Sequence, residues 1–261
     1  MNYYDQHLHT YFSFDSDEQF ENYLNDQPDF FVSTDHLDLK NPYSGFKDDI
    51  PDYIGYTKKL AELSKHWDTI FLKGIEIGIV PGQEETIKNY LISHPHDLIL
   101  VSIHQNGRFD YMDELVLTKD KFAVAQEYFQ QMLTVLLEFH QGDVLTHFDY
   151  GLRKFDFSKK ELEQFEPLLT DIFKKVIDLE MAVELNAKSF IKYGNAELYE
   201  FAVPLYTALL GGKSFTLGSD AHVASDYRLG FQEMASLLQK NGIDELTVFQ
   251  GKERFLTPLP I

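Results

Sequence analysis

Almost every stretch of this chain that looks like a β-strand ends in a side chain able to bind a metal ion, and a helical pattern follows it. The strand-like stretches are residues 3–7, 30–34, 69–78, 97–103, 144–146, 182–185 and 214–217. Seven such units in succession predict parallel strands with crossover helices. All strand ends of a barrel face one mouth, whereas the outer strands of an open sheet lie far apart. The ligand pattern therefore favours an α/β barrel with its site at the carboxyl ends of the strands.

The segments between these strands predict helices at residues 18–25, 53–66, 84–92, 122–140, 161–179, 196–210 and 230–240. Pro204 is expected to kink the helix in which it lies. Two polar stretches, residues 37–50 and 105–120, are predicted to be loops, and residues 246–260 to add a short hairpin. Neither an internal repeat nor a Pro/Gly/Ser-rich linker interrupts the pattern. We therefore expect a single domain over residues 1–261.

Composition argues against several classes of protein. The chain has no run of about 18 apolar residues, as a transmembrane helix requires, and no secretory signal is visible at its N-terminus. The absence of Cys excludes disulfides, thiolate catalysis and Cys-based zinc sites, and fits a cytoplasmic protein. A formal net charge of −19 argues against binding nucleic acid. Bound metal ions would offset part of this negative charge, or the acidity serves solubility. We expect a small molecule as the binding partner. The oligomeric state stays open.

Six of the ten histidines stand at predicted strand ends, and they are joined there by two carboxylates. This set is His7, His9, His36, His104, His147, His222, Glu76 and Asp220. His7 and His9 lie two residues apart and so share one side of an extended segment. Each motif alone has an ordinary explanation, such as a buried salt bridge for Glu76 or a satisfied core histidine for His104. Their conjunction predicts a hydrolytic site with several metal ions, whereas His66, His94, His96 and His140 fit surface or packing positions.

Other polar residues near the predicted site form three groups. Carboxylates next to the ligands are expected to orient them, namely Asp5, Asp35 and Asp149. Ser102 and Asn186 are small polar groups at strand ends, suited to hydrogen-bonding a substrate or a metal-bound water. Basic residues in the loops are candidates for a phosphate clamp, with simple solvation as the alternative: Arg108, Arg153, Lys188, Lys192 and Arg228.

The motifs, in order, resemble those of the polymerase-and-histidinol-phosphatase (PHP) family. They are Asp5-x-His7-x-His9-Thr10, Thr34-Asp35-His36, Gly74-x-Glu76-Ile77, Ser102-x-His104, His147-x-Asp149, Glu184-Leu185-Asn186 and Ser219-Asp220-Ala221-His222. The resemblance covers residues 5–222. The stretch 7–15 and the lack of an appended domain are similar to the histidinol-phosphate phosphatase branch of that family.

The resemblance implies a distorted (β/α)7 TIM-like barrel with two to three divalent ions, which are zinc, manganese or iron. The first ion would be held by His7, His9, Glu76 and Asp220, and the second by Glu76, His104 and His147. The third would be held by His36 and His222 with Asp15, where part of the family has His; Asp17 competes for that role. The Arg that the family carries after Asn186 has no clear match, and Lys188 or Lys192 would substitute for it.

The activity implied is hydrolysis of L-histidinol phosphate by a hydroxide held between two ions. Arg153 would offset the charge on the phosphoryl oxygens, and Asp220 or His222 would protonate the leaving oxygen. Two alternatives stay open. One is a PHP phosphoesterase acting on another small phosphoester, a nucleotide or a phosphotyrosine. The other is a metal-binding domain without catalytic activity.

Overall fold

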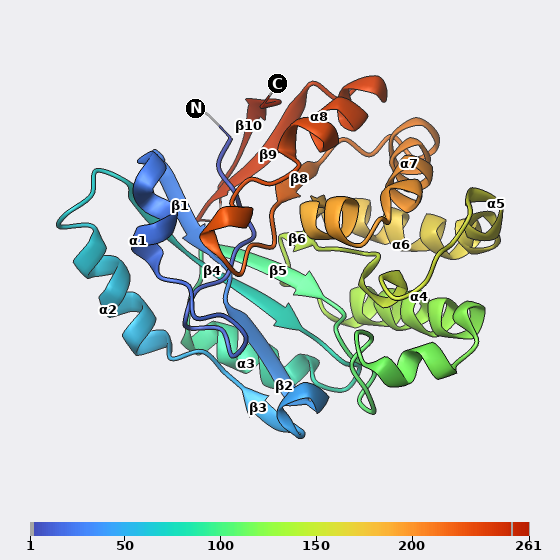
Figure 1. The fold of residues 1–261 in the computed structure, drawn as a ribbon, viewed down its shortest axis with the longest axis horizontal. Coiled ribbons are helices and arrows are strands. Elements are labelled where there is room, and N and C mark those ends of the chain that lie inside the picture. The colour runs from blue at the N-terminus through green and yellow to red at the C-terminus, as the bar shows by residue number, and fades with distance from the viewer. Residues whose placement is uncertain (1–2, 252, 261) are drawn as a thin grey trace.

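The computed structural model describes residues 3–251 and 253–260, and Figure 1 shows its strands at the centre with helices around them. The strands are β1 (Phe30–Ser33), β2 (His36–Asn41), β3 (Lys47–Asp49), β4 (Ile70–Gly78), β5 (Leu98–Ser102), β6 (Val144–Leu145), β7 (Ala182–Asn186), β8 (Phe215–Gly218), β9 (Glu245–Gln250) and β10 (Glu253–Pro258). The helices are α1 (Phe20–Tyr23), α2 (Tyr53–Leu63), α3 (Glu84–Ser93), α4 (Lys121–Glu138), α5 (Lys159–Leu162), α6 (Glu166–Asp178), α7 (Ala196–Pro204) and α8 (Phe231–Lys240).

The central sheet runs in the order β3-β2-β4-β5-β6-β7-β8, and β1 also pairs with β4. All of these pairs are parallel except β2 with β3, so the predicted parallel arrangement is confirmed. The register places His36 of β2 opposite Glu76 of β4. Since neighbouring strands run the same way, their carboxyl ends gather at one side of the molecule.

Residues 7–9 close the ring of strands. The amide of Thr34 donates to the Leu8 carbonyl over 2.8 Å, and the amide of His9 donates to the Ala221 carbonyl over 2.8 Å. This extended segment thereby lies between the residue that follows β1 and those that follow β8, which completes a distorted barrel of seven parallel units.

The predicted first strand at residues 3–7 is nevertheless wrong. The Tyr3 hydroxyl donates to the Leu217 carbonyl and accepts from the Leu217 amide, both over 2.6 Å. These are backbone groups of β8 that a strand ladder would use. A side chain therefore occupies them, and the segment is extended without being part of a sheet, except for a single bridge from Leu8 to Ala221.

The predicted loop at residues 37–50 is also wrong, because it contains most of β2 and all of β3. Leu37, Asp38 and Leu39 are all buried, which polar flanking residues obscured in the sequence. The second predicted loop, residues 105–120, carries the 3₁₀ helix Glu114–Thr118.

Two predicted helices are interrupted. The helix expected at 161–179 is split into α5, a 3₁₀ turn and α6, with Pro167 in the first turn of α6, where a missing N–H costs little. The helix expected at 196–210 changes at Pro204 into a π-helical turn, Leu205–Leu209, which is consistent with the expected disturbance. The predicted terminal hairpin is confirmed as β9–β10.

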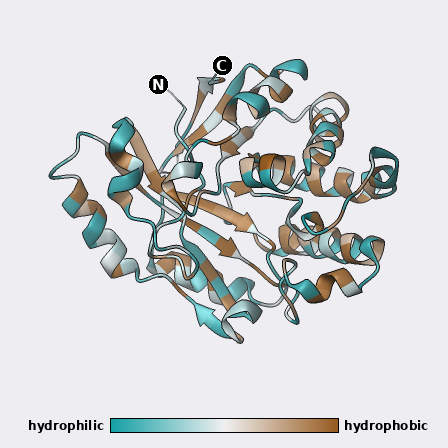
Figure 2. Cartoon of the chain, in the orientation of Figure 1, coloured by the Kyte–Doolittle hydropathy of each residue, from teal (hydrophilic) through white to brown (hydrophobic). Residues whose placement is uncertain are grey.

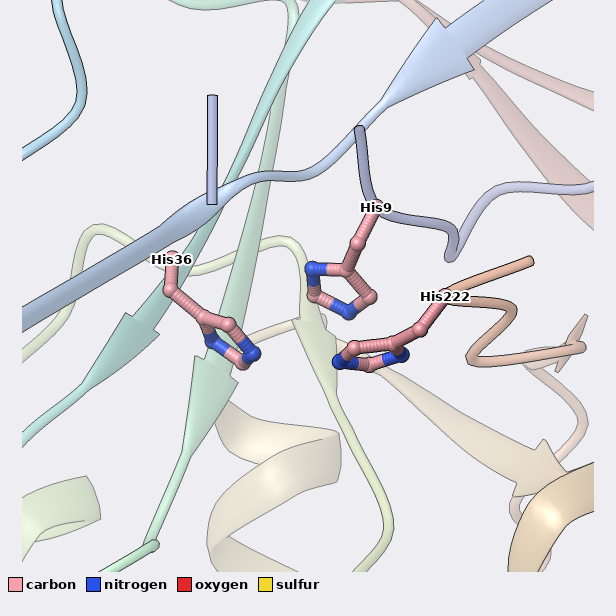
Figure 3. Close-up of side chains that lie close together, drawn as sticks. All are labelled: His9, His36 and His222. Atoms are coloured by element: carbon pink, nitrogen blue, oxygen red, sulfur yellow. The ribbon is translucent and has the colours of Figure 1, made fainter. Parts of the chain in front are cut away.

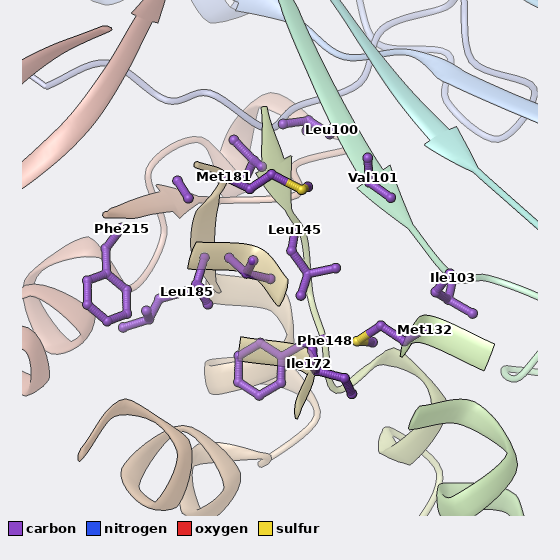
Figure 4. Packing of buried hydrophobic residues seen from close by; sticks show 14 of the residues in the cluster. Leu100, Val101, Ile103, Met132, Leu145, Phe148, Ile172, Met181, Leu185 and Phe215 are labelled. Carbon is purple, nitrogen blue, oxygen red and sulfur yellow. The ribbon is translucent and has the colours of Figure 1, made fainter. Parts of the chain in front are cut away.

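The core lies between the strands and the helices that cover them. Figure 4 shows Val101, Leu145 and Leu185 from the neighbouring strands β5, β6 and β7 in this core, with Ile172 of α6 beside Phe148. Figure 2 shows β4 and β5 as largely hydrophobic and β3 as hydrophilic. Among the described residues, no helix is both long and apolar enough to cross a membrane.

Candidate metal centre

The side chains of Glu76 and the strand-end histidines meet at the carboxyl end of the barrel. Glu76 lies near the end of β4 and is fully buried. Its Oε2 lies 3.1 Å from His7 Nε2 and 3.3 Å from His9 Nε2. Its Oε1 lies 3.1 Å from His104 Nε2 and 2.7 Å from His147 Nε2. His36 Nδ1 also lies 3.2 Å from Oε2. The two oxygens of one carboxylate thus face different sets of imidazoles, which is the geometry of a bridging ligand.

Asp220 joins His7, His9 and Glu76, which we call the first group of candidate ligands. Its Oδ1 lies 3.5 Å from His9 Nε2 and 3.9 Å from His7 Nε2. The Asp220 backbone has a φ of 54°, in the left-handed region that Asp tolerates better than most residues. Four donors of the first group, from His7, His9, Glu76 and Asp220, therefore surround one point.

A third group stands at the mouth of the barrel. Asp15 Oδ2 lies 3.0 Å from His222 Nε2 and 3.5 Å from His36 Nε2. Figure 3 shows His9, His36 and His222 turned toward one another from three separate segments. Candidate ligand atoms of these three rings all lie within 4.8 Å of one another. Asp17, the competing candidate, does not line the pocket at the mouth, whereas Asp15 does.

The donor set fits divalent metal ions. Nitrogen and carboxylate oxygen ligands suit zinc, manganese and iron. Nε2 of His9 is buried and has no hydrogen-bond partner among the described residues, although it faces two carboxylates. A buried polar atom without a partner is costly unless something else binds it. The residues present therefore fit a site with two or three ions.

Three of the histidines are oriented by hydrogen bonds on their other ring nitrogen. His7 Nδ1 lies 2.6 Å from Glu184 Oε1, His104 Nδ1 lies 3.0 Å from Asp38 Oδ1, and His9 Nδ1 lies 3.1 Å from Ser13 Oγ. Such contacts fix the tautomer and direct Nε2 toward the centre. We did not predict Asp38, Glu184 or Ser13 as site residues. The signal for Glu184 was the same as for Glu76, a carboxylate inside an apolar strand.

Two glycines make room for these pairs. A Cβ at Gly78, at the end of β4, would lie 1.8 Å from Asp38 Oδ1 and 2.6 Å from His104 Nδ1. A Cβ at Gly218, at the end of β8, would lie 2.0 Å from Glu184 Oε1. Any side chain at either position would displace a carboxylate that orients a histidine.

We expected three carboxylates to orient the candidate ligands directly, namely Asp5, Asp35 and Asp149. Each one instead accepts hydrogen bonds from other groups. Asp5 accepts from the backbone amides of His7 and Ser219. Asp35 accepts from the hydroxyl of Ser13, which in turn contacts His9. Asp149 accepts from the Tyr199 hydroxyl and from the Asn195 amide group. In the structure, none of the three makes a side-chain hydrogen bond to an imidazole of the centre.

The two small polar residues lie behind the ligands and are fully buried. Ser102 donates to Glu76 Oε1 over 2.5 Å. Asn186 donates to Glu184 and accepts from Arg153 Nη2 over 3.0 Å. Both therefore hold other site residues in place and do not line the pocket.

The five basic candidates divide into two sets. Arg153 and Lys188 line a cavity of about 260 Å³ above the centre, and both contact Asp220. Arg108 is largely exposed and pairs with Glu127, while Lys192 pairs with Asp226. Arg228 packs over the ring of Phe231. The cavity is not lined by Arg108, Lys192 or Arg228, so we leave these three residues out of the phosphate clamp.

Charges across the centre shift the pKa values of its groups in opposite directions. Burial alone would raise the pKa of Glu76, but the charges of His7, His36 and His104 hold it well below its ordinary value. Burial would lower the pKa of His104, and Asp38 and Glu76 raise it well above the ordinary value. Without metal the centre thus retains protons that an incoming cation must displace.

Comparison with known proteins agrees with this geometry. The chain is 28% identical over 256 residues to the histidinol-phosphatase of Lactococcus lactis, covering 95% of this chain and 94% of that protein. It is 29% identical over 245 residues to the probable histidinol-phosphatase of Clostridium acetobutylicum, covering 90% and 92% of the two chains.

A solved structure shares the fold. The histidinol phosphate phosphatase of Lactococcus lactis, complexed with zinc, L-histidinol and phosphate, superposes with a TM-score of 0.85 at 25% identity. The match covers 96% of this chain and 98% of the other. The model of the PHP domain matches residues 5–188, well over half of the sequence. The chain belongs to the PHP domain family.

Proposed function

We propose that this protein is a metal-dependent phosphomonoesterase that hydrolyses L-histidinol phosphate to L-histidinol and phosphate. The observation that carries the proposal is the Glu76 carboxylate, whose two oxygens face two separate sets of imidazoles. Arg153 and Lys188 stand beside that centre in the same cavity. Several cations converging on one point suit the binding of a phosphoryl group. Hydrolysis of a phosphate monoester is among the slowest uncatalysed reactions, so it needs such stabilisation.

Each of the three groups would hold one ion. His7, His9, Glu76 and Asp220 would hold the first, Glu76, His104 and His147 the second, and Asp15, His36 and His222 the third. When bound, such ions lower the pKa of water and supply positive charge to the phosphoryl group. The donor set suits zinc, manganese or iron, and the zinc in the Lactococcus lactis structure supports zinc.

The protein's own side chains would bind the phosphoryl oxygens and supply the proton. Arg153 and Lys188 would hold the oxygens. Burial would raise the pKa of Asp220, but Lys188 and the neighbouring histidines hold it well below its ordinary value, so Asp220 stays ionised. We therefore assign protonation of the leaving oxygen to His222 in a form with two ions. In a form with three ions, the His222 ring would be a ligand.

Two carboxylates in the cavity wall suit a cationic leaving group. Asp110 and Asp113 line the cavity, and neither forms an ion pair with a Lys or Arg of the described residues. Burial raises the pKa of Asp110, so a cation placed beside it would relieve the cost of its charge. Phe14 and Tyr43 add aromatic surface. The names of the relatives and the L-histidinol in the Lactococcus lactis structure support the same substrate.

A panel of phosphomonoesters tests this substrate. Metal-loaded protein should release phosphate from L-histidinol phosphate with a kcat/KM at least about 100-fold above that for glycerol phosphate, phosphotyrosine or a 3′-phosphorylated mononucleotide. Similar rates on all of them would remove histidinol phosphate as the preferred substrate but keep the phosphatase. Failure to hydrolyse any of them would support the alternative of a metal-binding domain without catalytic activity.

A further inference from the structure

The Arg153 guanidinium is held from several sides. It follows the 3₁₀ turn Tyr150–Leu152, and its side chain is only 2% exposed. Its Nε donates to Ser189 Oγ over 2.8 Å, and its Nη2 donates to Asn186 Oδ1 over 3.0 Å. Because the hydrogen bonds fix two of its nitrogens, the plane of the guanidinium has a defined orientation.

Two tyrosine rings flank the same guanidinium. Arg153 Cζ lies 4.9 Å from the centroid of Tyr150 and 5.1 Å from that of Tyr193. Tyr150 is further held by a hydrogen bond from its hydroxyl to Asp110. Tyr193 is 38% exposed and lines the cavity, so its ring separates this side of the guanidinium from solvent. A cation over an aromatic face is attracted by the ring, and more strongly where water is excluded.

One short segment supplies most of this arrangement. Asn186 ends β7, and Ser189 lies in the π-helical turn Lys188–Lys192 that follows. The amide of Tyr193 donates to the Lys188 carbonyl over 3.1 Å. Beyond it, the side chain of Asn195 donates to Asp149 over 2.7 Å, which anchors the segment to the one that carries Arg153. The position of Tyr193 is therefore set by the backbone that also presents Lys188.

We propose that Tyr193 is a positioning residue, whose ring face holds the Arg153 guanidinium in the orientation that binds the phosphoryl group. This role rests on the proposed function, which assigns no part to Tyr193. The ring acts and the hydroxyl does not, because the contact is to the face of the ring. Without the ring, that face of the guanidinium is open to water, and the hydrogen bonds to Ser189 and Asn186 hold its plane without support from that side.

The test compares the metal-loaded parent protein with its Tyr193→Ala and Tyr193→Phe variants. It measures the Kd for inorganic phosphate and the steady-state constants for the phosphomonoester. Tyr193→Ala should raise the Kd for inorganic phosphate and the KM for the phosphomonoester about 5- to 20-fold, with a smaller change in kcat. Tyr193→Phe should stay within about 2-fold of the parent protein, since it keeps the ring. Phe255→Ala is the matched control, because Phe255 is equally exposed at 38% on β10 but does not line the cavity.

A double-mutant cycle guards against a general loss of structure. In an Arg153→Gln background, Tyr193→Ala should change the Kd for phosphate less than about 2-fold, because its partner is already gone. An unchanged Kd in the single Tyr193→Ala variant would overturn the proposal. Equal losses in the Phe and Ala variants, or a full loss that persists in the Arg153→Gln background, would do so too.

The binding measurement separates this proposal from the proposed function. Calorimetry with inorganic phosphate needs no turnover. A parent protein that binds phosphate but hydrolyses no phosphomonoester would refute the proposed function, while the ratio between the Tyr193 variants still decides the role of the ring. A metal-loaded parent protein that binds no phosphate would overturn both.

Discussion

Two groups of histidines in this protein, one buried and one half-buried, differ in what faces them. At the barrel mouth, His36 faces Asp15 and Glu76. Near α2 and α3, His96 packs against the rings of Tyr53 and Tyr90. Burial would lower the pKa of His36, but the carboxylates raise it from 6.5 to about 9. Burial lowers the pKa of His96 from 6.5 to about 4.

The difference shows that bringing imidazoles together away from solvent does not by itself make a metal site. Both regions bring aromatic and imidazole rings together, and His94 joins His96 in the second. Only the first adds carboxylates whose charge favours a cation between the rings. Glu76 is the carboxylate that most imidazoles share, so the predictions begin with it.

The largest effect is expected from Glu76→Gln. The change keeps the shape but removes the charge shared by two groups of ligands, so bound metal should fall and phosphate release should drop about 1000-fold or more. Metal analysis and steady-state rates measure both. Glu253→Gln, at an exposed glutamate of β10, is the matched control. Full metal content and rate in Glu76→Gln would remove the bridging role.

A smaller loss is expected from Glu184→Gln. Glu184 contacts His7 Nδ1 and accepts from the backbone amide of His147, but it faces no candidate ion. Loss of an orienting carboxylate should reduce metal affinity or rate about 10- to 100-fold. A chelator titration followed by rate would measure it. A decrease as large as that of Glu76→Gln would mean that Glu184 is itself a ligand.

Asp110→Asn should affect the substrate and leave the metal in place. We expect the KM for L-histidinol phosphate to rise about 5- to 10-fold, because one charge-assisted contact to the leaving group is lost. The KM for glycerol phosphate, which has a neutral leaving group, should not change. Equal changes for both substrates would place the effect at the phosphoryl end of the cavity.

Stability of the metal-free protein should depend on the two histidines with opposite signs. The proton on His36 stabilises the folded state fully below pH 6.5, and this contribution is lost as pH rises toward 9. Above pH 6.5 His96 is neutral in both the folded and the unfolded protein, so it does not change the free energy of unfolding. As pH drops toward 4, the unfolded protein binds a proton that folded His96 does not, and the free energy of unfolding decreases. Each effect is on the order of 3 kcal/mol.

Denaturant unfolding of chelated protein across pH 4 to 9 checks both signs. His36→Gln should flatten the alkaline side of the profile, and His96→Gln should flatten the acidic side without changing the rate of phosphate release by the metal-loaded protein. If either variant flattens the opposite side, the contrast between the two regions is wrong.

The candidate ligands could be chosen from the sequence because their signals are local. His7 and His9 share a side through their spacing, and Glu76 stands out in an apolar strand. Asp38 was missed because it lay within a stretch interpreted as a loop, although pairing with β4 makes that stretch a strand. The sequence also could not show that Tyr3 would take the backbone groups of β8.

The basic residues show where sequence reasoning stops. Arg108, Arg153, Lys188, Lys192 and Arg228 all follow strands, and only two of them line the cavity. The direction of a loop side chain depends on its tertiary partners, such as Glu127 for Arg108 and Asp226 for Lys192. Those partners lie 19 and 34 residues away in the chain, where no local pattern connects them.

Phosphate release from L-histidinol phosphate by purified protein is the measurement to make first. It should be followed in the protein as isolated, after chelation, and after return of Zn²⁺, Mn²⁺ or Fe²⁺. We predict rapid release that chelation abolishes and at least one of these ions restores. Release that persists after complete removal of metal, or a metal-loaded protein that leaves L-histidinol phosphate intact, would contradict the account.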